Sequence, residues 1–555
     1  MIALTTFLLL ILGIFSSIRV SVKTDKWLSF IVFLLFCVIF GQFSHNIINS
    51  AQDVFSFIWN KSPGGDIQID IISNPYNYGF VLPFFIITLL SLALNLLFRY
   101  EERRNIYEAG LIFNLAALIT MITSNNFVQL LFALFIVDIL ALLLVHDIEA
   151  YRRYILLNIS ADLMIFTVLA IINSRVASLD IREILQYKQI GLHIDFIAII
   201  GLTAIFMKFG FFIFHIGLLG LRNIRLHRLQ NILFLSAPVC ALILLTKFHV
   251  LLSGSAYFNT YLHLVCCLSL GGGFVGSLCS QNYKQRIIYW QMMFWALFVE
   301  LLRFNGFIWN LSLTFLLLQT YILNIALYLI YYYTGRHYHQ NDLSKINLVN
   351  QSAMLSALML ILLMVVAITG VLTELYNKGN RYYIWTYAIL YILSLSATLK
   401  SIFFVKKKAS YAHSPHLAPH YLVWILLGCS AAIVLYPTPI NAVTIWGFGA
   451  AFILLNRYNP IWRIAHIGYI CRFEQNDRIG LIYKYGVIKP LRLSGRVLWL
   501  LIDRFLTEKI IIGGSIKTAQ IGLRFFRKIH SNRILGGTII IVLLLGFLGL
   551  AYNYE

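Results

Sequence analysis

Long apolar runs separated by short polar segments make up most of the chain. About sixteen of them are long enough to cross the hydrocarbon core of a bilayer as a helix. We expect these spans at residues 3–20, 28–47, 78–98, 110–124, 127–146, 154–173, 196–219, 231–252, 262–280, 286–304, 309–332, 352–375, 383–404, 420–436, 439–455 and 534–551. Because a segment surrounded by lipid must satisfy its own backbone hydrogen bonds, helices are the expected structure. The pattern therefore predicts an all-α polytopic membrane protein.

Basic residues gather in the loops that follow odd-numbered spans. Such loops contain Arg103 and Arg104, then Arg222 and Arg225, and later Lys406 to Lys408. Loops after even-numbered spans have few basic residues or balance them with acids, as in 48–77 and 174–195. By the positive-inside rule, the odd-numbered loops lie in the cytoplasm. We therefore expect a multi-pass protein of the bacterial inner membrane with both termini in the periplasm.

The composition supports a membrane protein and argues against a soluble nucleic-acid-binding protein. Of the 555 residues, 60% are hydrophobic and only 12% are charged, which suits a chain that lies mostly in lipid. The formal net charge of +21 would suggest a nucleic-acid partner in a soluble protein. Here most of the basic residues lie in the loops between spans and in the stretch 456–533, which explains the positive net charge. The bilayer is therefore the expected partner, and nucleic acid is not.

The stretch 456–533 has a different pattern from the rest. It contains fifteen basic and four acidic residues, and its apolar segments are interrupted by charge. Arg492, Arg496 and Asp503 fall on one helical face, which is typical of an amphipathic helix on a membrane surface. We expect three N-terminal spans in 1–104, a cytoplasmic lateral helix within 456–533 and an anchoring span in 534–555.

Charged residues inside the spans are the main chemical signal. A charge at the centre of a bilayer costs about 2.5–3.5 kcal/mol, so it usually faces the bundle interior and has a partner. The candidates for a proton relay are Asp138, Lys208, Glu300, Glu374 and Lys400, together with the polar residues Thr320 and Asn324. A buried lysine can change its protonation, because burial disfavours its charge and a nearby carboxylate restores it. The alternative is that Asp138 and Lys208 form one static ion pair.

Several other polar residues and glycines are expected to have structural roles and no part in proton transfer. Asp162 and Lys247 are expected near span ends, where a long side chain reaches the interface at low cost. His215 is expected to be a packing residue, and Gly271 to Gly273 to allow close helix packing rather than phosphate binding. The seven cysteines show no spacing typical of a metal site or a disulfide framework.

Short segments give a family resemblance. The stretch LIYKYGVIKPL, 481–491, resembles the D-x-L-Y-x-x-x-V-x-K-P segment of the largest antiporter-like membrane subunit of respiratory complex I and of related multisubunit cation/proton antiporters. SLDIREIL, 178–185, and QNYKQRIIYW, 281–290, are similar to two further family segments. The resemblance implies sixteen spans, an antiporter-like core in 105–455 and a lateral helix before the last span. It also places Asp138 and Lys208 at the family's carboxylate–lysine pair.

The chain also departs from the family pattern. Thr320 and Asn324 stand where the family has a histidine and a lysine in its eleventh span, and Glu374 stands in place of a terminal lysine. Threonine and asparagine can hold water but cannot store a charge near neutral pH. HIGLLGLRN, in the seventh span, lacks the proline near which the family breaks that helix.

Three functions remain open. The first is a proton- or cation-translocating subunit of a membrane NADH:quinone oxidoreductase-type complex, without redox chemistry of its own. We expect no NADH, flavin, iron–sulfur or metal site in this chain, and other membrane subunits as its partners. The alternatives are a non-conducting paralogue that braces a membrane complex and a stand-alone cation/proton antiporter.

Overall fold

The computed structural model divides the chain into two compact units, Met1–Glu474 and Gln475–Glu555. All but one of the described residues belong to the first unit. The described residues are 2–17, 25–48, 53–60, 67–73, 75–97, 104–145, 148–176, 180–181, 184, 194–280, 283–310, 313–314, 316–318, 320–322, 324–325 and 493. The predicted spans from 352 onward, the lateral helix and the last span therefore lie outside them, apart from Leu493.

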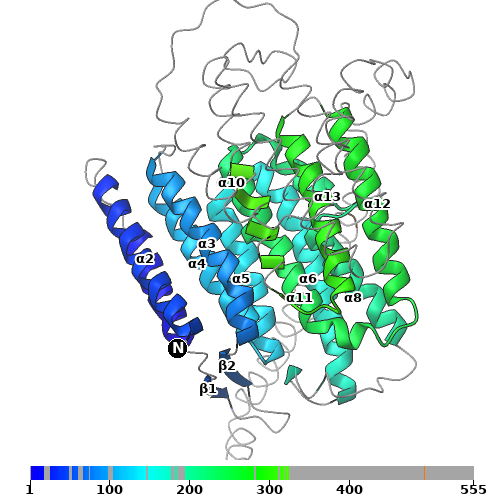
Figure 1. The fold of residues 1–555 in the computed structure, drawn as a ribbon. Coiled ribbons are helices and arrows are strands. Elements are labelled where there is room, and N and C mark those ends of the chain that lie inside the picture. Colours follow the sequence, from blue (N-terminus) through cyan, green and yellow to red (C-terminus); the bar gives the residue numbers. More distant parts are fainter. Residues whose placement is uncertain are drawn as a thin grey trace, which may run out of the picture. The chain divides into compact units, whose positions relative to one another are not determined.

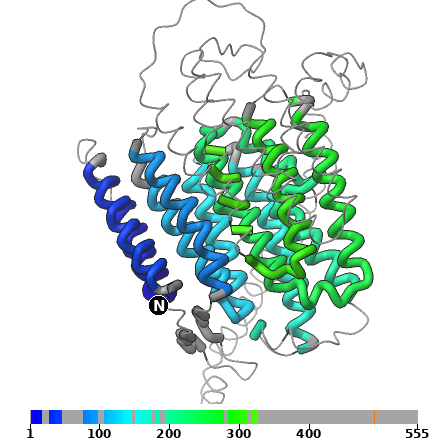
Figure 2. The backbone as a smooth tube through the Cα atoms, viewed as in Figure 1, coloured from blue at the N-terminus to red at the C-terminus, as the bar shows by residue number. Residues whose placement is uncertain are grey.

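The first unit is a bundle of helices (Figures 1 and 2). In chain order the helices are α1 Ile2–Ser17, α2 Asp25–Ile48, α3 Pro75–Leu97, α4 Arg104–Thr123, α5 Phe127–Val145, α6 Ile148–Val176, α8 Ile194–Phe209, α9 Ile216–Leu219, the 3-10 helix η2 Gly220–Asn223, α10 Leu226–Leu235, α11 Ala237–Leu252, α12 Phe258–Cys279 and α13 Tyr283–Phe304. The predicted all-α membrane fold is confirmed in this part of the chain.

Between α2 and α3 lies a two-stranded antiparallel hairpin, where the sequence suggested only a loop. Strand β1, Asp53–Asn60, pairs with β2, Ile67–Ser73, so that Val54 faces Ile72 and Phe57 faces Ile69. Strand β2 alternates apolar and polar residues over 67–71, and the segment between the strands contains Pro63, Gly64 and Gly65. That combination is typical of a hairpin.

Eight helical segments of the described residues are long and apolar enough to cross a membrane. They are Trp27–His45, Tyr76–Leu96, Ile106–Thr123, Phe127–Val145, Tyr154–Ser174, Leu226–Leu252, Phe258–Ser277 and Lys284–Phe304. Each corresponds to one predicted span. The short segment Ser124–Asn126 separates α4 from α5, so the two adjacent runs at 110–146 are two helices.

The seventh predicted span, 196–219, is not one continuous helix. Helix α8 has 16 residues and so rises about 24 Å, less than the ~30 Å hydrocarbon core of a typical bilayer. It ends at Phe209, and the chain passes through an irregular segment before α9 and η2. The expectation of a continuous helix was wrong, and the break lies at a glycine, not a proline.

The helices pack in a chain of neighbours, α1 on α4, α4 on α5, α5 on α6, α6 on α8 and α8 on α11, with α12 on α13. Glycines allow the closest of these contacts. A Cβ at Gly276 would lie 2.3 Å from the ring of Tyr289, and one at Gly273 would lie 2.4 Å from Met293. The predicted packing role is confirmed for Gly272 and Gly273 but not for Gly271, where a Cβ would meet nothing within 4 Å.

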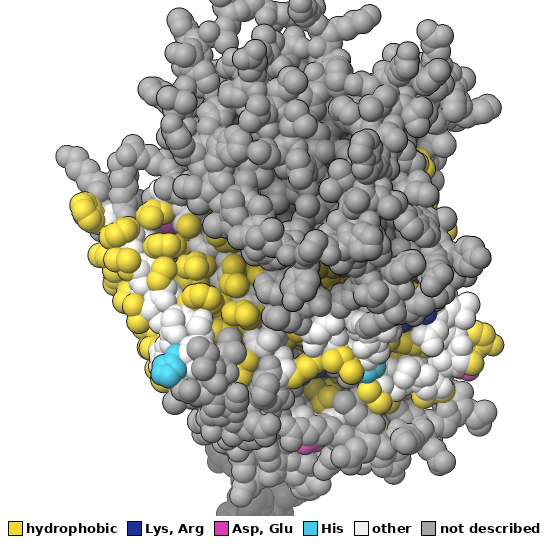
Figure 3. All heavy atoms as spheres, viewed as in Figure 1, with side chains coloured by type: hydrophobic (Ala, Val, Ile, Leu, Met, Phe, Trp, Pro, Cys, Tyr) yellow, Lys and Arg dark blue, Asp and Glu magenta, His cyan; other side chains and the backbone are white. Residues whose placement is uncertain are grey.

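One apolar face lies over α1 and α2. Trp27 and Val38 are among its most exposed side chains, and Figure 3 shows hydrophobic side chains covering this part of the surface. A large exposed apolar face is unusual for a soluble protein and is typical of a surface in contact with lipid or another membrane protein.

Candidate functional site

Lys208 lies between two carboxylates in the interior of the bundle. Its ammonium nitrogen is 2.9 Å from Oδ2 of Asp138 on α5 and 2.6 Å from Oδ1 of Asp162 on α6. All three side chains are at most 1% exposed. The predicted contact between Asp138 and Lys208 is therefore present, and three helices meet at one buried ionic cluster.

Asp162 was missed as a site residue. The sequence reading placed it near a span end, reaching the interface, but α6 runs from Ile148 to Val176 and places Asp162 in its middle. The expectation was wrong because the predicted span 154–173 already has Asp162 near its centre, and the earlier start of α6 does not change that position. A signal was available: Asp162 is an acid inside a predicted span, like Asp138.

Two tyrosines fix the helix that carries Asp162. The Tyr151 hydroxyl donates to the backbone oxygen of Asp138, at 2.8 Å, and so ties α6 to α5. The Tyr154 hydroxyl bonds with Oγ of Ser236, at 3.0 Å, and accepts from the backbone N–H of Ala237, at 3.3 Å. Ser236 lies at the junction between α10 and α11. Asp162 is thus held on an element that is hydrogen-bonded on two sides.

The charges in the cluster do not balance. Two carboxylates face one ammonium group, so full ionisation leaves one surplus negative charge in a buried place. Among the described residues, no hydrogen bond reaches Oδ1 of Asp138 or Oδ2 of Asp162. Two carboxylates that share a site do not both ionise easily, since like charges at close range repel. The arrangement can therefore hold a proton in addition to the one on Lys208.

A Schellman motif ends α8 directly after Lys208. Gly210 has φ +66°, its N–H donates to Met207 O at 3.1 Å, and the N–H of Phe211 donates to Phe206 O at 3.1 Å. This is the usual way in which a glycine closes a helix. Lys208 therefore lies in the last turn, where the helix dipole favours a positive charge.

The segment that follows the end of α8 is held in place by contacts with α12 and α13. Ile213 has φ +77°, a conformation that costs energy for a β-branched residue. The N–H of Phe212 donates to Oγ of Ser269 on α12, at 3.0 Å. The Phe212 ring lies so close to Gly272 that a Cβ there would be 2.2 Å away. His215 is buried next to Tyr289, with a ring distance of 5.4 Å, which fits its predicted packing role.

Replacement of Gly210 by alanine is expected to destabilise the protein by about 2 kcal/mol or more. A left-handed conformation costs roughly 1–2 kcal/mol for a residue with a Cβ. The new Cβ would also lie 2.3 Å from Leu218. Thermal unfolding of the purified chain in detergent measures the effect. Gly271→Ala is the control, because a Cβ at Gly271 meets nothing within 4 Å. Equal unfolding temperatures for the two variants would contradict this reading of the break.

Glu300 belongs to a separate ionic group. Its Oε2 accepts from Arg303, one turn further along α13, at 2.8 Å, and its Oε1 is 2.9 Å from Nδ1 of His263 on α12. Glu300 is 1% exposed, whereas His263 is 27% exposed and Arg303 21%. The structure therefore gives Glu300 partners other than Lys208, and neither partner was among the candidates from the sequence.

Thr320 and Asn324 lie one turn apart, and both are buried. The Thr320 hydroxyl donates to Leu316 O at 2.9 Å, and the Asn324 amide donates to Thr320 O at 2.8 Å. The Gln230 amide of α10 donates to Asn324 O. These two relay candidates therefore direct side-chain donors to the backbone of their own segment.

A polar network continues beside them. Tyr321 donates to Oδ1 of Asn231 at 2.9 Å, and Ser91 of α3 donates to the same oxygen at 2.8 Å. The Asn231 amide donates to the Tyr107 hydroxyl of α4. These four side chains are buried and link three helices with hydroxyl and amide groups. The remaining candidates, Glu374 and Lys400, lie outside the described residues.

No family model and no curated protein matches the chain. Solved structures do. A chain of respiratory complex I from Thermus thermophilus with bound NADH is 15% identical with a TM-score of 0.63, over 81% of this chain and 100% of that chain. A chain of the membrane-bound sulfane sulfur reductase, an archaeal respiratory membrane complex, is 14% identical with a TM-score of 0.66, over 81% of this chain and 97% of that one.

A third match is a chain of the Mrp complex from a Dietzia species. It is 12% identical with a TM-score of 0.67, over 94% of this chain, and the match spans 63% of that chain's length. At identities this low, such matches show a common fold. The chain is therefore a multi-pass membrane protein with the fold found in chains of these three complexes.

Proposed function

We propose that the chain is an antiporter-like subunit of a multisubunit membrane complex and that it translocates protons or another cation. The observation that carries the proposal is the Asp138–Lys208–Asp162 cluster. It is buried, it has a surplus carboxylate, and it lies beside a helix break on the fold shared with chains of respiratory and Mrp complexes. Intramembrane acids and lysines with named partners are typical of proton relays.

The cluster can act as a site that loads and releases a proton. Protonation of either carboxylate weakens the electrostatic attraction that holds the Lys208 ammonium group, because one ion pair is lost. The ammonium group then bonds more strongly to the remaining carboxylate, or passes its own proton on. Proton transfer needs groups within hydrogen-bond reach, and the distances of 2.6 and 2.9 Å meet that requirement.

Redox chemistry would belong to other subunits. In this proposal the chain is a non-redox subunit of an NADH:quinone oxidoreductase-type complex, similar to the largest antiporter-like subunit. Its basic segment 456–533 would form the cytoplasmic lateral helix that braces neighbouring subunits, with 534–555 as the anchor. The resemblance of the stretch 481–491 supports this part of the proposal.

One observation favours a non-conducting structural role. Thr320 and Asn324 direct donors to the backbone, and the network around Asn231 contains hydroxyl and amide groups in place of groups that carry charge. A relay through this region would depend on water. A subunit that braces a complex would keep the fold and the buried ion pairs and would need no continuous route.

The Lys208→Arg variant distinguishes proton conduction from a purely structural role. Arginine keeps the positive charge, so assembly should survive, but its guanidinium stays protonated and cannot pass a proton. In vesicles that contain the whole complex, we expect at least tenfold slower proton translocation with unchanged subunit content. A pH-sensitive dye inside the vesicles measures the rate. Wild-type translocation in the assembled variant would favour the structural role and refute conduction through this cluster.

A further inference from the structure

Two buried polar side chains lie side by side where the segment after α8 meets α13. His215, the residue before α9, is 4% exposed, and Tyr289 of α13 is 2% exposed. Their ring centroids are 5.4 Å apart, with the ring planes at 52°. Ring packing explains where the imidazole lies, but it satisfies none of its polar atoms.

Each of these side chains has a buried polar atom without a hydrogen bond. Among the described residues, no group bonds to Nδ1 of His215 or to the hydroxyl oxygen of Tyr289. A buried donor or acceptor without a partner destabilises a fold, so native proteins contain few of them. A packing role needs only an apolar ring, and this segment has phenylalanine at 209, 211, 212 and 214. Two unpartnered polar atoms on neighbouring rings therefore favour a role other than packing.

The pair lies on the cytoplasmic side of the buried ionic cluster. A Cβ at Gly217 would be 2.5 Å from Leu157, which precedes Asp162 on α6 by five residues, or about 7.5 Å along the helix. A Cβ at Gly210 would be 3.9 Å from Cα of His215, so the chain folds back beside the end of α8. Helices α6 and α13 both follow odd-numbered spans, so the charge pattern assigns their first residues to the cytoplasmic side.

We propose that His215 is a second proton-carrying residue of this chain, that it exchanges protons with Lys208 through water, and that Tyr289 stabilises its charged form. In this step the Lys208 ammonium group loses one proton to water, and the water gives one proton to the imidazole ring. One positive charge thereby moves from the ammonium group to an imidazolium. Both nitrogens of an imidazolium carry an N–H group, and a tyrosine hydroxyl can accept from one of them. This inference rests on the proposed translocation of protons.

His215→Phe should slow transport without lowering stability. Phenylalanine keeps a ring beside Tyr289 and removes the unpartnered nitrogen, so the unfolding temperature of the chain in detergent should stay the same or rise. In vesicles that contain the whole complex, proton translocation should slow at least tenfold with unchanged subunit content, because a missing acid–base group typically costs about 10²–10⁴ in rate. A wild-type rate in this variant would overturn the proposal.

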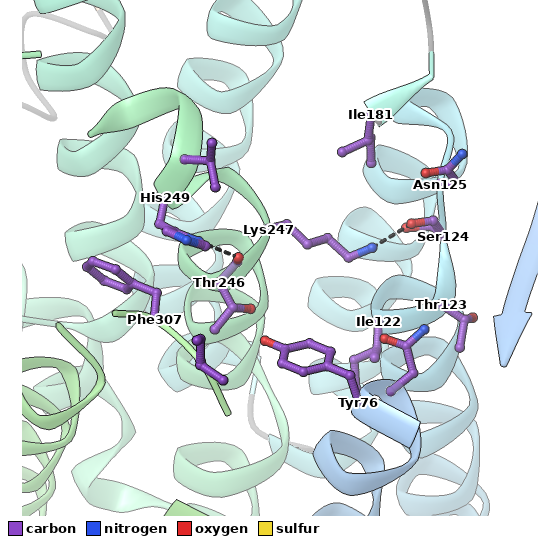
Figure 4. Close-up of a pocket in the computed structure, with 13 residues that line it drawn as sticks. Tyr76, Ile122, Thr123, Ser124, Asn125, Ile181, Thr246, Lys247, His249 and Phe307 are labelled. Atoms are coloured by element: carbon purple, nitrogen blue, oxygen red, sulfur yellow. Dashed lines mark hydrogen bonds between the residues drawn. The ribbon is translucent and has the colours of Figure 1, made fainter. Parts of the chain in front are cut away.

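His249→Phe is the matched control. His249 also packs against an aromatic ring, that of Phe307 at 4.9 Å, but its Nδ1 lies 2.8 Å from Thr246 O. It lines a separate cavity of about 320 Å³ that the end of α11 helps to form (Figure 4). We expect translocation within about twofold of wild type. Equal slowing in the two variants would overturn the specific role of His215.

A spectroscopic signature separates proton uptake from a structural role. With isotope-labelled histidine in the whole complex, infrared difference spectra during turnover should contain an imidazole band that reports protonation of the ring. We expect this band to disappear in His215→Phe and to persist in His249→Phe. A band that persists in His215→Phe, or a wild-type spectrum without one, would contradict proton uptake by His215.

Tyr289→Phe covers the case in which His215→Phe does not assemble. The exchange removes one unpartnered oxygen, so stability should not fall, whereas translocation should slow at least about threefold, the worth of one hydrogen bond. Tyr257→Phe is its control, because Tyr257 is 58% exposed. A wild-type rate in Tyr289→Phe would overturn the role of the pair.

Lys208→Arg, measured in the same vesicles, separates this inference from the proposed function. If Lys208→Arg is slow while His215→Phe and Tyr289→Phe keep the wild-type rate, only the role of His215 is refuted. If all three variants keep the wild-type rate, conduction through the cluster is refuted, and the role of His215 with it.

Discussion

Replacement of Lys208 by methionine is expected to destabilise the protein by about 3–5 kcal/mol. Removing one partner of a buried ion pair leaves an uncompensated charge in a medium that solvates it poorly. Here the change strands two carboxylates, Asp138 and Asp162, both at most 1% exposed. The unfolding free energy of the purified chain, measured with denaturant or heat in a fixed detergent, gives the size of the loss.

The matched control removes the whole cluster. A triple variant with Asp138→Asn, Asp162→Asn and Lys208→Met has no buried charge left to compensate. We expect it to be more stable than Lys208→Met alone, because uncharged amides cost much less to bury than carboxylates. A triple variant that is less stable than the single one would contradict this account, because it would show that the two carboxylates stabilise the fold even without Lys208.

Asp162→Asn is expected to slow proton translocation at least tenfold while the complex stays assembled. The exchange leaves one carboxylate and one ammonium group, Asp138 and Lys208, which form a balanced pair. The fold should therefore survive, whereas the surplus carboxylate that can accept a proton is lost. A missing acid–base group typically costs 10²–10⁴ in rate, so tenfold is a low threshold. Vesicles that contain the whole complex and a pH-sensitive dye report the rate.

The control for this exchange lies on the same helix as Lys208. Asp195 is in the first turn of α8 and accepts from the Ser255 hydroxyl at 2.5 Å. Asp195→Asn removes the same charge at the far end of α8, so it should leave the rate within twofold of wild type. If both variants lost translocation to the same degree, a general effect on the helix would explain the result, and Asp162 would have no special role.

Much of the fold was predictable because few backbone structures can satisfy their hydrogen bonds inside a bilayer. Apolar runs of spanning length predict helices, and basic loops predict their orientation. Segments beside loops assigned to one side, at the start of α3, the end of α4 and the end of α11, do line one cavity. The hairpin at 53–73 was missed because a long segment between spans was treated as a loop, although the alternation in β2 and the Pro-Gly-Gly sequence before it are typical of a hairpin.

The site was predictable only in part. Asp138 and Lys208 stood out because each is a charge near the middle of an apolar run. Asp162 also lies near the centre of its predicted span, 154–173, and was wrongly assigned to a span end. The break after Lys208 was overlooked because proline was taken as the signal, whereas Gly210 breaks the helix through its positive φ.

The contact between Glu300 and His263 could not be predicted from the sequence for a different reason. His263 lies on a neighbouring helix, and its contact with Glu300 depends on how α12 and α13 are aligned. Close packing at Gly273 and Gly276 sets that alignment. Side-chain volumes across two helices decide such a contact, and a single sequence gives no register between helices. Intrahelical pairs are easier, and Arg303 lies three residues after Glu300.

If the Asp138–Lys208–Asp162 cluster conducts protons, its protonation must change during turnover. Infrared difference spectra of the assembled complex, recorded between resting and turning-over states, detect this change directly through the C=O stretch of a protonated carboxyl group. We expect a carboxyl band that changes during turnover in wild type and is lost in both Asp138→Asn and Asp162→Asn, but not in Asp195→Asn. A wild-type spectrum without such a band, or a band that persists in both cluster variants, would contradict conduction through the cluster.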